Sequence, residues 1–188
     1  MTRLRVLGFA VLLVLGAAAY AAASPASRSD DNGDGRRHIA IRDDCDPRDP
    51  AWNAVGGCTL KRGDVSFAEF NGELDSPLSL AVIGHQAWRN DPSYLKIRSG
   101  TTVRVTNRGG RPHTFTRVAA FGGGKVPNPA LNEGLVTAPE CPGSVDIPPR
   151  GRMNVSGLPV GNHRFMCCIH PWMRAVIKVK ADNQNKDD

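Results

Sequence analysis

Sulfur and nitrogen donors are concentrated in one short stretch near the end of the chain, HRFMCCIHPWM, residues 163–173. Within it Cys167, His170 and Met173 have the spacing Cys-x2-His-x2-Met. A thiolate, an imidazole and a thioether form a soft donor set, which suits copper better than calcium or magnesium, because those two ions prefer oxygen ligands. The stretch predicts a metal site; a structural disulfide or an apolar strand end that contains sulfur are the alternatives.

These three donors do not complete a copper site. A trigonal blue-copper centre needs two histidines and one cysteine, with a weak axial methionine. His113 is the candidate for the second histidine, because it follows Gly-Gly-Arg-Pro and begins the segment HTFTRV. We therefore expect His113, Cys167, His170 and Met173 to form one site. A turn role for His113 and simple core packing for Met173 are the alternatives.

The segments around these residues have the pattern of short strands. From residue 94 to 118, YLKIRSGTTVRVTNRGGRPHTFTRV, apolar and polar residues alternate and glycines mark the turns. A Gly/Pro-rich connection follows over residues 119–149, and we expect further strands near 153–155, 162–166 and 174–179. A chain of this kind is typical of an all-β fold, a sandwich or a barrel. One strand start and one strand-to-strand turn can then bring the four donors to the same end of the fold.

The region before these strands has two features of its own. Ser66 and Glu69 have the spacing of a capping box, and Phe67, Phe70 and Leu74 follow at helical spacing, which predicts a short amphipathic helix. Residues 45 and 58 are cysteines that flank a loop rich in proline and glycine, so a local disulfide is expected between them.

The first 23 residues have the pattern of a secretory signal peptide. A short basic head precedes an apolar run and a small-residue exit that ends near Ala23. An uncleaved membrane anchor is the alternative, since the run is just long enough to span a bilayer. We expect cleavage, a flexible polar linker over residues 24–37, and a mature chain that is secreted or periplasmic and does not span the membrane. Residues 183–188 form a polar tail.

Two segments together resemble the cupredoxin family, the plastocyanin/azurin-like blue copper proteins. They are GTTVRVTNRGGRPHTF and HRFMCCIHPWMRAVIKV. The family pattern is an early histidine followed by a small polar residue, then an aromatic residue and Cys-x-x-His-Pro-x-Met before the last strand. The matching residues here are His113, Thr114, Phe165, Cys167, His170, Pro171 and Met173. The resemblance covers roughly residues 94–180. It implies a Greek-key β-sandwich that holds one type 1 copper ion for electron transfer.

The predicted organisation is thus an all-β, cupredoxin-like copper-binding domain over residues 94–182, with an N-terminal extension over 38–93 that contains the short helix and packs on the core. Cys168 stands where the family usually has another residue. Five cysteines leave one without a partner. Because only Cys167 has the two-residue gap to His170, we assign it to the metal and pair Cys168 with Cys141 and Cys45 with Cys58.

The composition excludes several other functions. The net charge of +6 is small and the basic residues are interleaved with acids, so nucleic-acid binding is not expected. The chain has no His-x-His pairs, no credible Ser/His/Asp triad and no phosphate loop, so we expect no enzymatic activity. We predict a monomeric one-electron carrier with a protein redox partner of unknown identity. A copper-delivery protein without a redox partner and a copper-free structural domain are the alternatives.

We make two further predictions about residues next to the site. Thr114 is placed to hydrogen-bond toward the cysteine strand, which would orient the ligands. Electrons are expected to leave through a solvent-facing edge of His170, with Pro171 and Trp172 forming an apolar docking patch around it. The alternative for Trp172 is an aromatic side chain that is packed inside and closes the end of the sandwich.

Overall fold

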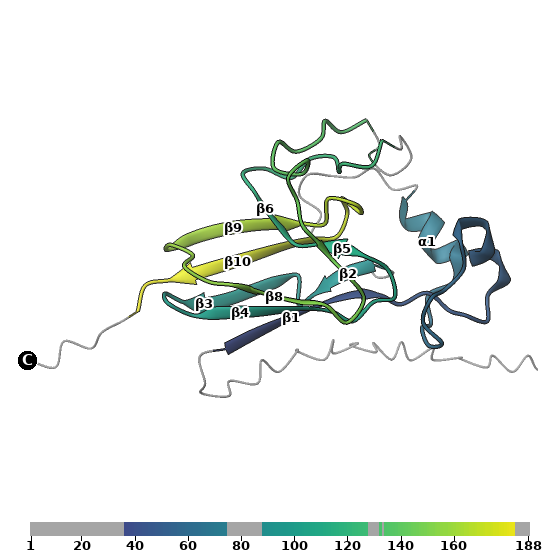
Figure 1. The fold of residues 1–188 in the computed structure, drawn as a ribbon, viewed down its shortest axis with the longest axis horizontal. Helices are drawn as coiled ribbons and strands as arrows, with labels where there is room; N and C mark the ends of the chain where they lie inside the picture. The colour runs from purple at the N-terminus through teal and green to yellow at the C-terminus, as the bar shows by residue number, and fades with distance from the viewer. Residues whose placement is uncertain (1–35, 75–87, 128–131, 133, 183–188) are drawn as a thin grey trace, which may run out of the picture. The chain divides into compact units, whose positions relative to one another are not determined.

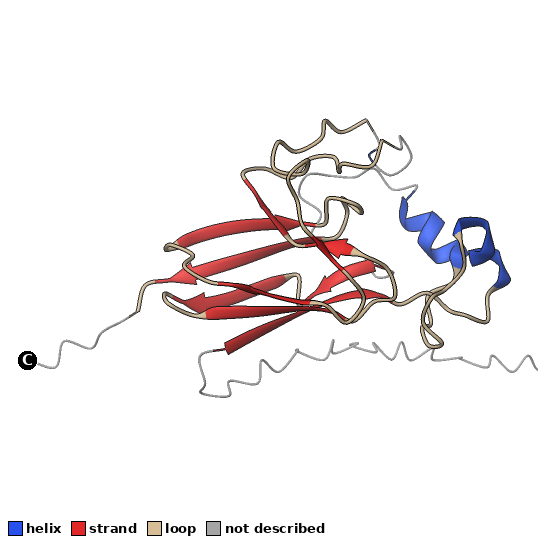
Figure 2. Cartoon of the chain, viewed as in Figure 1, coloured by secondary structure: helices blue, strands red, loops and turns tan. Residues whose placement is uncertain are grey.

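Strands are the main regular elements of the described chain, and helices are few and short (Figures 1 and 2). The computed structural model describes residues 36–74, 88–127, 132 and 134–182, and all of them belong to one compact unit. Eight of the strands form two four-stranded sheets, and two short ones form a separate pair. The predicted all-β sandwich is therefore confirmed.

The first sheet has the strand order β2-β1-β4-β8. Its strands are β1 (Arg36–Asp43), β2 (Trp88–Asp91), β4 (Thr102–Asn107) and β8 (Arg152–Val155). β1 lies inside the sheet, parallel to β4 and antiparallel to β2. A parallel neighbour needs a crossover connection and not a hairpin, which explains why β1 and β4 are far apart in sequence.

The second sheet has the strand order β3-β10-β9-β6. Its strands are β3 (Tyr94–Arg98), β6 (Thr116–Val118), β9 (Gly161–Met166) and β10 (Arg174–Lys180). β10 is parallel to β3 and antiparallel to β9. The separate pair joins β5 (His113–Thr114) to β7 (Asp146–Ile147).

The core lies between the two main sheets, where the alternating apolar residues of the strands meet. Val103 and Val105 of β4 are completely buried, as the alternation predicts. The rings of Phe115 and Phe165 stack with their centroids 4.5 Å apart, next to the end of the sandwich that carries the donor residues.

The predicted short helix is present as α1 (Phe67–Leu74), which follows the 3-10 helix η1 (Pro50–Val55). Its capping box is formed: the Ser66 backbone N–H donates to the Glu69 carboxylate at 2.8 Å, and the Glu69 N–H donates to Ser66 Oγ at 3.2 Å. These two bonds satisfy donors that the first turn of a helix leaves unpaired. Phe70 of α1 is buried against Trp52 of η1, with ring centroids 5.0 Å apart.

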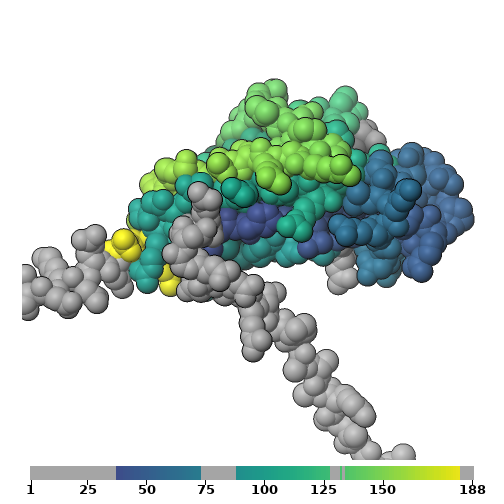
Figure 3. Space-filling view, turned by 60° about the horizontal axis from the view of Figure 1, so that its bottom comes forward, coloured from purple at the N-terminus to yellow at the C-terminus, as the bar shows by residue number. Residues whose placement is uncertain are grey.

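The region upstream of residue 94 contributes to the sandwich itself as well as to its end. β1 and β2 are strands of the first sheet, and β1 already includes Arg36 and Arg37 of the predicted linker. The segment with η1 and α1, blue in Figure 3, packs against the other elements at one end of the sandwich. The sandwich thus begins before the predicted domain start at residue 94.

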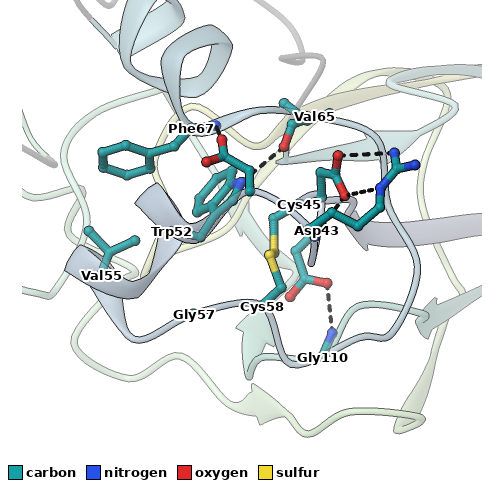
Figure 4. Close-up of a disulfide and its surroundings, with 12 residues drawn as sticks. Asp43, Cys45, Trp52, Val55, Gly57, Cys58, Val65, Phe67 and Gly110 are labelled. Carbon is teal, nitrogen blue, oxygen red and sulfur yellow. Dashed lines mark hydrogen bonds and ion pairs between the residues drawn. A yellow bond between two sulfur atoms is a disulfide. The ribbon is translucent and has the colours of Figure 1, made fainter.

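Both expected disulfides are present. Cys45 is bonded to Cys58 and Cys141 to Cys168, and Cys167 is a free, buried cysteine. Figure 4 shows the Cys45–Cys58 bond between η1 and the strand that ends at Asp43.

Some predicted segments lie outside the described residues. These are the signal peptide over 1–23, most of the linker over 24–37, and the tail over 183–188. In the ranges that are described, no helix is both long enough and apolar enough to cross a bilayer.

Candidate metal centre

The turn between β9 and β10 carries three of the four predicted ligands. The two strands are paired up to Met166 and Arg174, so the residues between them form a closed loop. Inside the loop the Cys167 N–H donates to the Met173 carbonyl and the Met173 N–H donates to the His170 carbonyl, each at 2.9 Å. These bonds close the backbone into a tight turn, which directs the side chains of Cys167 and His170 toward the interior.

The short strand β5 places His113 opposite this loop. The backbone N–H of Thr114 donates to Cys167 Sγ at 3.3 Å. The Thr114 hydroxyl oxygen accepts a hydrogen bond from the Cys168 N–H at 2.7 Å. Thr114 therefore bonds toward the cysteine strand, as expected, and fastens β5 to the loop.

Three donor atoms form a small, nearly regular triangle. The distance from His113 Nδ1 to His170 Nδ1 is 3.1 Å, and Cys167 Sγ lies 3.8 Å and 3.6 Å from these two atoms. For a trigonal ion of zinc or copper size, bond lengths of about 2.0 Å to nitrogen and 2.3 Å to sulfur place the donors about 3.5 and 3.7 Å apart. The three side chains are buried and fit such an ion.

Met173 lies in the same loop and is completely buried. Its carbonyl accepts hydrogen bonds from the Cys167 N–H and from the side-chain amide of Asn90, the latter at 3.1 Å. The backbone of Met173 is thus fixed next to the triangle. Its role as an axial ligand stays a prediction.

An acidic residue from β1 holds the outer side of His113. The Asp43 carboxylate lies 3.4 Å from His113 Nε2 and also accepts hydrogen bonds from the backbone N–H groups of Gly110 and Arg111, at 2.6 and 2.9 Å. Figure 4 shows the bond between Asp43 and Gly110. A side chain at Gly109 would collide with this carboxylate, so Gly109 leaves the space that Asp43 needs, whereas a side chain at Gly110 would collide with Thr59.

These contacts change the proton affinity of the histidine. Burial alone lowers the pKa of His113, but the hydrogen bonds to Asp43 and Cys167 outweigh it and raise the pKa to about 9. Because Nε2 faces Asp43, Nδ1 faces the triangle. A second hydrogen-bonding partner of this kind fixes the orientation of a ligand histidine.

The other two donors shift in the directions that metal binding requires. Burial opposes ionisation of Cys167, but the hydrogen bonds from His113 and His170 are stronger and hold the pKa of the thiol well below its ordinary value. Burial is also the main cause that lowers the pKa of His170. A thiolate and a neutral imidazole are the forms that bind metal ions.

Two aromatic side chains cover the site, one from the N-terminal region and one from the loop itself. Trp88 of β2 lies against the His170 ring at a centroid distance of 4.5 Å, and Trp172 stacks on Trp88 at 6.0 Å. His170 is only 7% exposed and Trp172 is completely buried. The predicted docking patch with Trp172 at its surface is therefore wrong, and the alternative, a packed aromatic that closes the sandwich end, is correct.

Sequence reasoning missed two residues at the site, Asp43 and Trp88. Asp43 had a signal: it continues the alternation of Ile39 and Ile41, both completely buried, so it points inward at the end of β1. An acid on the inner face of a strand needs a buried partner. Trp88 had no comparable signal, because its contact with His170 depends on the pairing of β2 with β1.

Comparison with known proteins gives matches among solved structures. Comparison of the chain with protein-family models and with curated proteins finds no match. A purple cupredoxin from Nitrosopumilus maritimus is 17% identical, with a TM-score of 0.40, over 77% of this chain and 99% of that one. A variant of amicyanin in its reduced state is 22% identical, with a TM-score of 0.33, over 48% and 71% of the two chains.

A second amicyanin variant, in its Cu(I) form, is 22% identical, with a TM-score of 0.32, over 47% of this chain and 70% of that one. At TM-scores this low, none of these likenesses adds a conclusion about the site. The all-β sandwich and the buried His113–Cys167–His170 cluster make the chain cupredoxin-like, as the resemblance in its sequence implies.

Proposed function

We propose that this chain is an exported type 1 copper protein that transfers one electron at a time. The observation that carries the proposal is the buried triangle of His113, Cys167 and His170. Its donor set is that of blue-copper sites, to which Met173 would add a weak axial thioether. A copper ion bound there would supply a one-electron redox couple.

The chain's own groups prepare the site before any metal arrives. Asp43 orients His113 through Nε2, and the Thr114 N–H donates to the sulfur of Cys167 at 3.3 Å. Hydrogen bonds to the sulfur and to the outer nitrogen tune the potential and the basicity of such ligands. The loop bonds between Cys167, His170 and Met173 limit movement of the donors, so a change of oxidation state needs little rearrangement.

Burial favours a carrier over a delivery protein. His113 and Cys167 have no exposed surface and His170 has little. A delivery protein must let an acceptor's ligands reach the metal, whereas an electron tunnels through packed side chains. The covered triangle thus suits electron exchange at a distance.

Two disulfides support the proposed export. Disulfides persist in oxidising compartments outside the cytoplasm. Four of the five cysteines are paired and the fifth belongs to the triangle, so each cysteine has a role that fits an exported copper protein.

The test is the visible spectrum of the mature chain with one equivalent of Cu(II). We expect an intense thiolate-to-copper charge-transfer band. Cys167→Ser should abolish the band. The matched control, Cys141→Ser with Cys168→Ser, removes the neighbouring sulfur and its disulfide partner together and should retain it.

Experiments on the same copper-treated protein distinguish the type 1 assignment from the alternative functions. Absence of the band with bound stoichiometric copper overturns the type 1 assignment. Tight Cu(I) binding without reversible one-electron cycling supports delivery. Failure to bind copper in any form supports a structural domain.

A further inference from the structure

Because His170 is covered, another ligand has to connect the triangle to the protein surface. His113 does so through Asp43, whose carboxylate lies 3.4 Å from His113 Nε2 and accepts the Gly110 N–H at 2.6 Å. Gly110 is partly exposed, although Asp43 and His113 are buried. Two short polar contacts thus join the triangle to the outside of the protein at Gly110.

Gly110 lies on the wall of a large groove. The groove has a volume of about 920 Å³ and is lined by three separate segments: residues 59–62, residues 106–110, and Pro149, Arg150 and Arg152. The first segment comes from the loop after the Cys45–Cys58 disulfide, and the others come from the ends of β4 and β8. We call it the cationic groove.

Five basic residues give the groove its charge, and all five are exposed: Lys61, Arg62, Arg108, Arg150 and Arg152. None of the lining residues is acidic. In the part of the chain that the structure describes, no hydrogen bond or ion pair engages any of these five side chains. Such a concentration of uncompensated like charge attracts anions and raises their rate of encounter.

We propose that the cationic groove docks an acidic face of the protein that exchanges electrons with the metal centre. The inference rests on the proposed function and names the contact surface for it. Docking there places the partner over Gly110, at the outer end of the contacts through Asp43 to His113. One electron passes in each encounter: the centre is oxidised as the partner's acceptor is reduced, or the reverse, and no bond forms or breaks.

The shape and chemistry of the groove favour a polypeptide partner. A single oxyanion contacts only a few donors, whereas these cations are distributed over three segments around an open volume of about 920 Å³. Several carboxylates on one protein surface match that distribution. The groove has no aromatic lining residue, and single-stranded nucleic acids are held largely by stacking on such residues.

The first experiment measures docking without copper. A deca-glutamate peptide is titrated into the metal-free, disulfide-intact protein labelled with 15N, at low and at high salt. We expect amide shifts confined to residues 59–62, 106–110 and 150–152, and binding that weakens with salt because exposed charges are screened.

The matched variants have equal net charge. Arg108→Glu with Arg152→Glu, inside the groove, should weaken peptide binding about tenfold or more, because two attractive charge contacts become repulsive. Lys96→Glu with Arg117→Glu, two exposed positions on β3 and β6, should change it less than about twofold. Dispersed amide spectra of both variants show that they fold.

Three results overturn the proposal. Equal loss in the two double variants means that only net charge attracts the peptide. Inorganic phosphate that produces the same shifts at the same concentration means a small-anion site. An oligothymidylate that binds more tightly than the peptide means a polynucleotide surface.

A second measurement connects docking to the metal. Stopped-flow oxidation of the copper-loaded protein by anionic hexacyanoferrate(III) should slow in the groove variant, and oxidation by cationic tris(phenanthroline)cobalt(III) should accelerate. Unchanged rates with both reagents overturn the route through the groove. Absence of the charge-transfer band would instead contradict the copper assignment. The peptide result would still test docking, because that titration uses the metal-free protein.

Discussion

Trp88 meets the ring of His170 edge-on, with centroids 4.5 Å apart and planes at 82°. Trp88 comes from β2, upstream of the segment that resembles the cupredoxins, and it stacks further on Trp52 of η1 at 6.3 Å. The N-terminal region therefore covers the metal loop directly. This cover is the reason why the outward path that we propose differs from the one that the sequence predicts.

Replacing Trp88 tests the role of this cover. Trp88→Ala should lower the free energy of unfolding by about 3 to 5 kcal/mol, as removal of a buried aromatic does. Water would then reach His170, which favours Cu(II) over Cu(I), so the reduction potential should fall. Chemical denaturation and cyclic voltammetry measure the two effects. Trp88→Phe, which keeps a ring in place, should show a smaller change in both; an unchanged potential in the alanine variant would contradict the covering role.

Replacing Asp43 tests the support of His113. Asp43→Asn removes the negative charge, so the pKa of His113 in the metal-free protein should fall from about 9 toward its ordinary value. Stability should drop by about 1.5 to 3 kcal/mol, because the buried Asp43 carboxylate accepts hydrogen bonds from the backbone N–H groups of Gly110 and Arg111. NMR titration of the ring nitrogens measures the pKa. Asp44→Asn, whose carboxylate pairs with Arg89 at 3.1 Å, is the control and should leave that pKa in place.

The metal-free protein should show a level range in its stability against pH. In the unfolded chain His113 titrates at 6.5 and Cys167 at 9.0, whereas in the folded protein the pKa of His113 is about 9 and that of Cys167 is well below 9.0. Above pH 6.5 the stability lost at His113 opposes the stability gained at Cys167, so stability should change little up to about pH 9.

Below pH 6.5 the contributions of His113 and Cys167 to stability no longer oppose each other. The unfolded chain then binds more protons at Cys167, and also at His170, whose folded pKa is lowered. Stability should therefore decrease as the pH falls, by about 1.4 kcal/mol per pH unit for each extra proton. Urea unfolding across this range measures it. In Cys167→Ser the compensating group is gone, so stability should instead decrease above pH 6.5; a level curve in that variant would contradict the assignment.

Thr114 offers a test of the link between β5 and the loop. Thr114→Val leaves the backbone N–H to Cys167 in place but removes the hydroxyl that accepts from Cys168. A buried N–H without a partner costs about 1 to 3 kcal/mol, which thermal unfolding of the metal-free protein would register. Thr116→Val, which removes only a donor to the Thr114 hydroxyl, should cost less. Equal losses would show that the two threonines act only through packing.

The sequence predicts those features that depend on the spacing of residues close together in the chain. Cys167 and His170 are three residues apart in one turn, so their residue types and spacing suffice to place them together. His113 is more distant, but its position at the start of a strand restricts it to one end of a sandwich. The capping box at Ser66 and Glu69 is likewise local, and the structure contains it.

Residues whose roles depend on strand pairing could not be predicted in this way. The position of Asp43 beside His113 follows from the parallel pairing of β1 with β4, which no local pattern indicates. Trp88 reaches His170 only because β2 extends the same sheet beyond β1. The exposed position predicted for Trp172 is wrong for the same reason, because a turn residue next to a ligand faces solvent unless another element covers it, and Trp88 does so here.

The adjacency of Cys167 and Cys168 has a consequence for the exported copper protein that we propose, which would mature in an oxidising compartment. Cys141 has two candidate sulfurs one residue apart, and only its bond to Cys168 leaves the thiolate that copper needs. Pairing with Cys167 instead would give a chain with the same number of disulfides but without the thiolate of the triangle. The choice that thiol oxidation makes between two neighbouring residues thus decides whether a chain becomes a metalloprotein, before any copper is encountered.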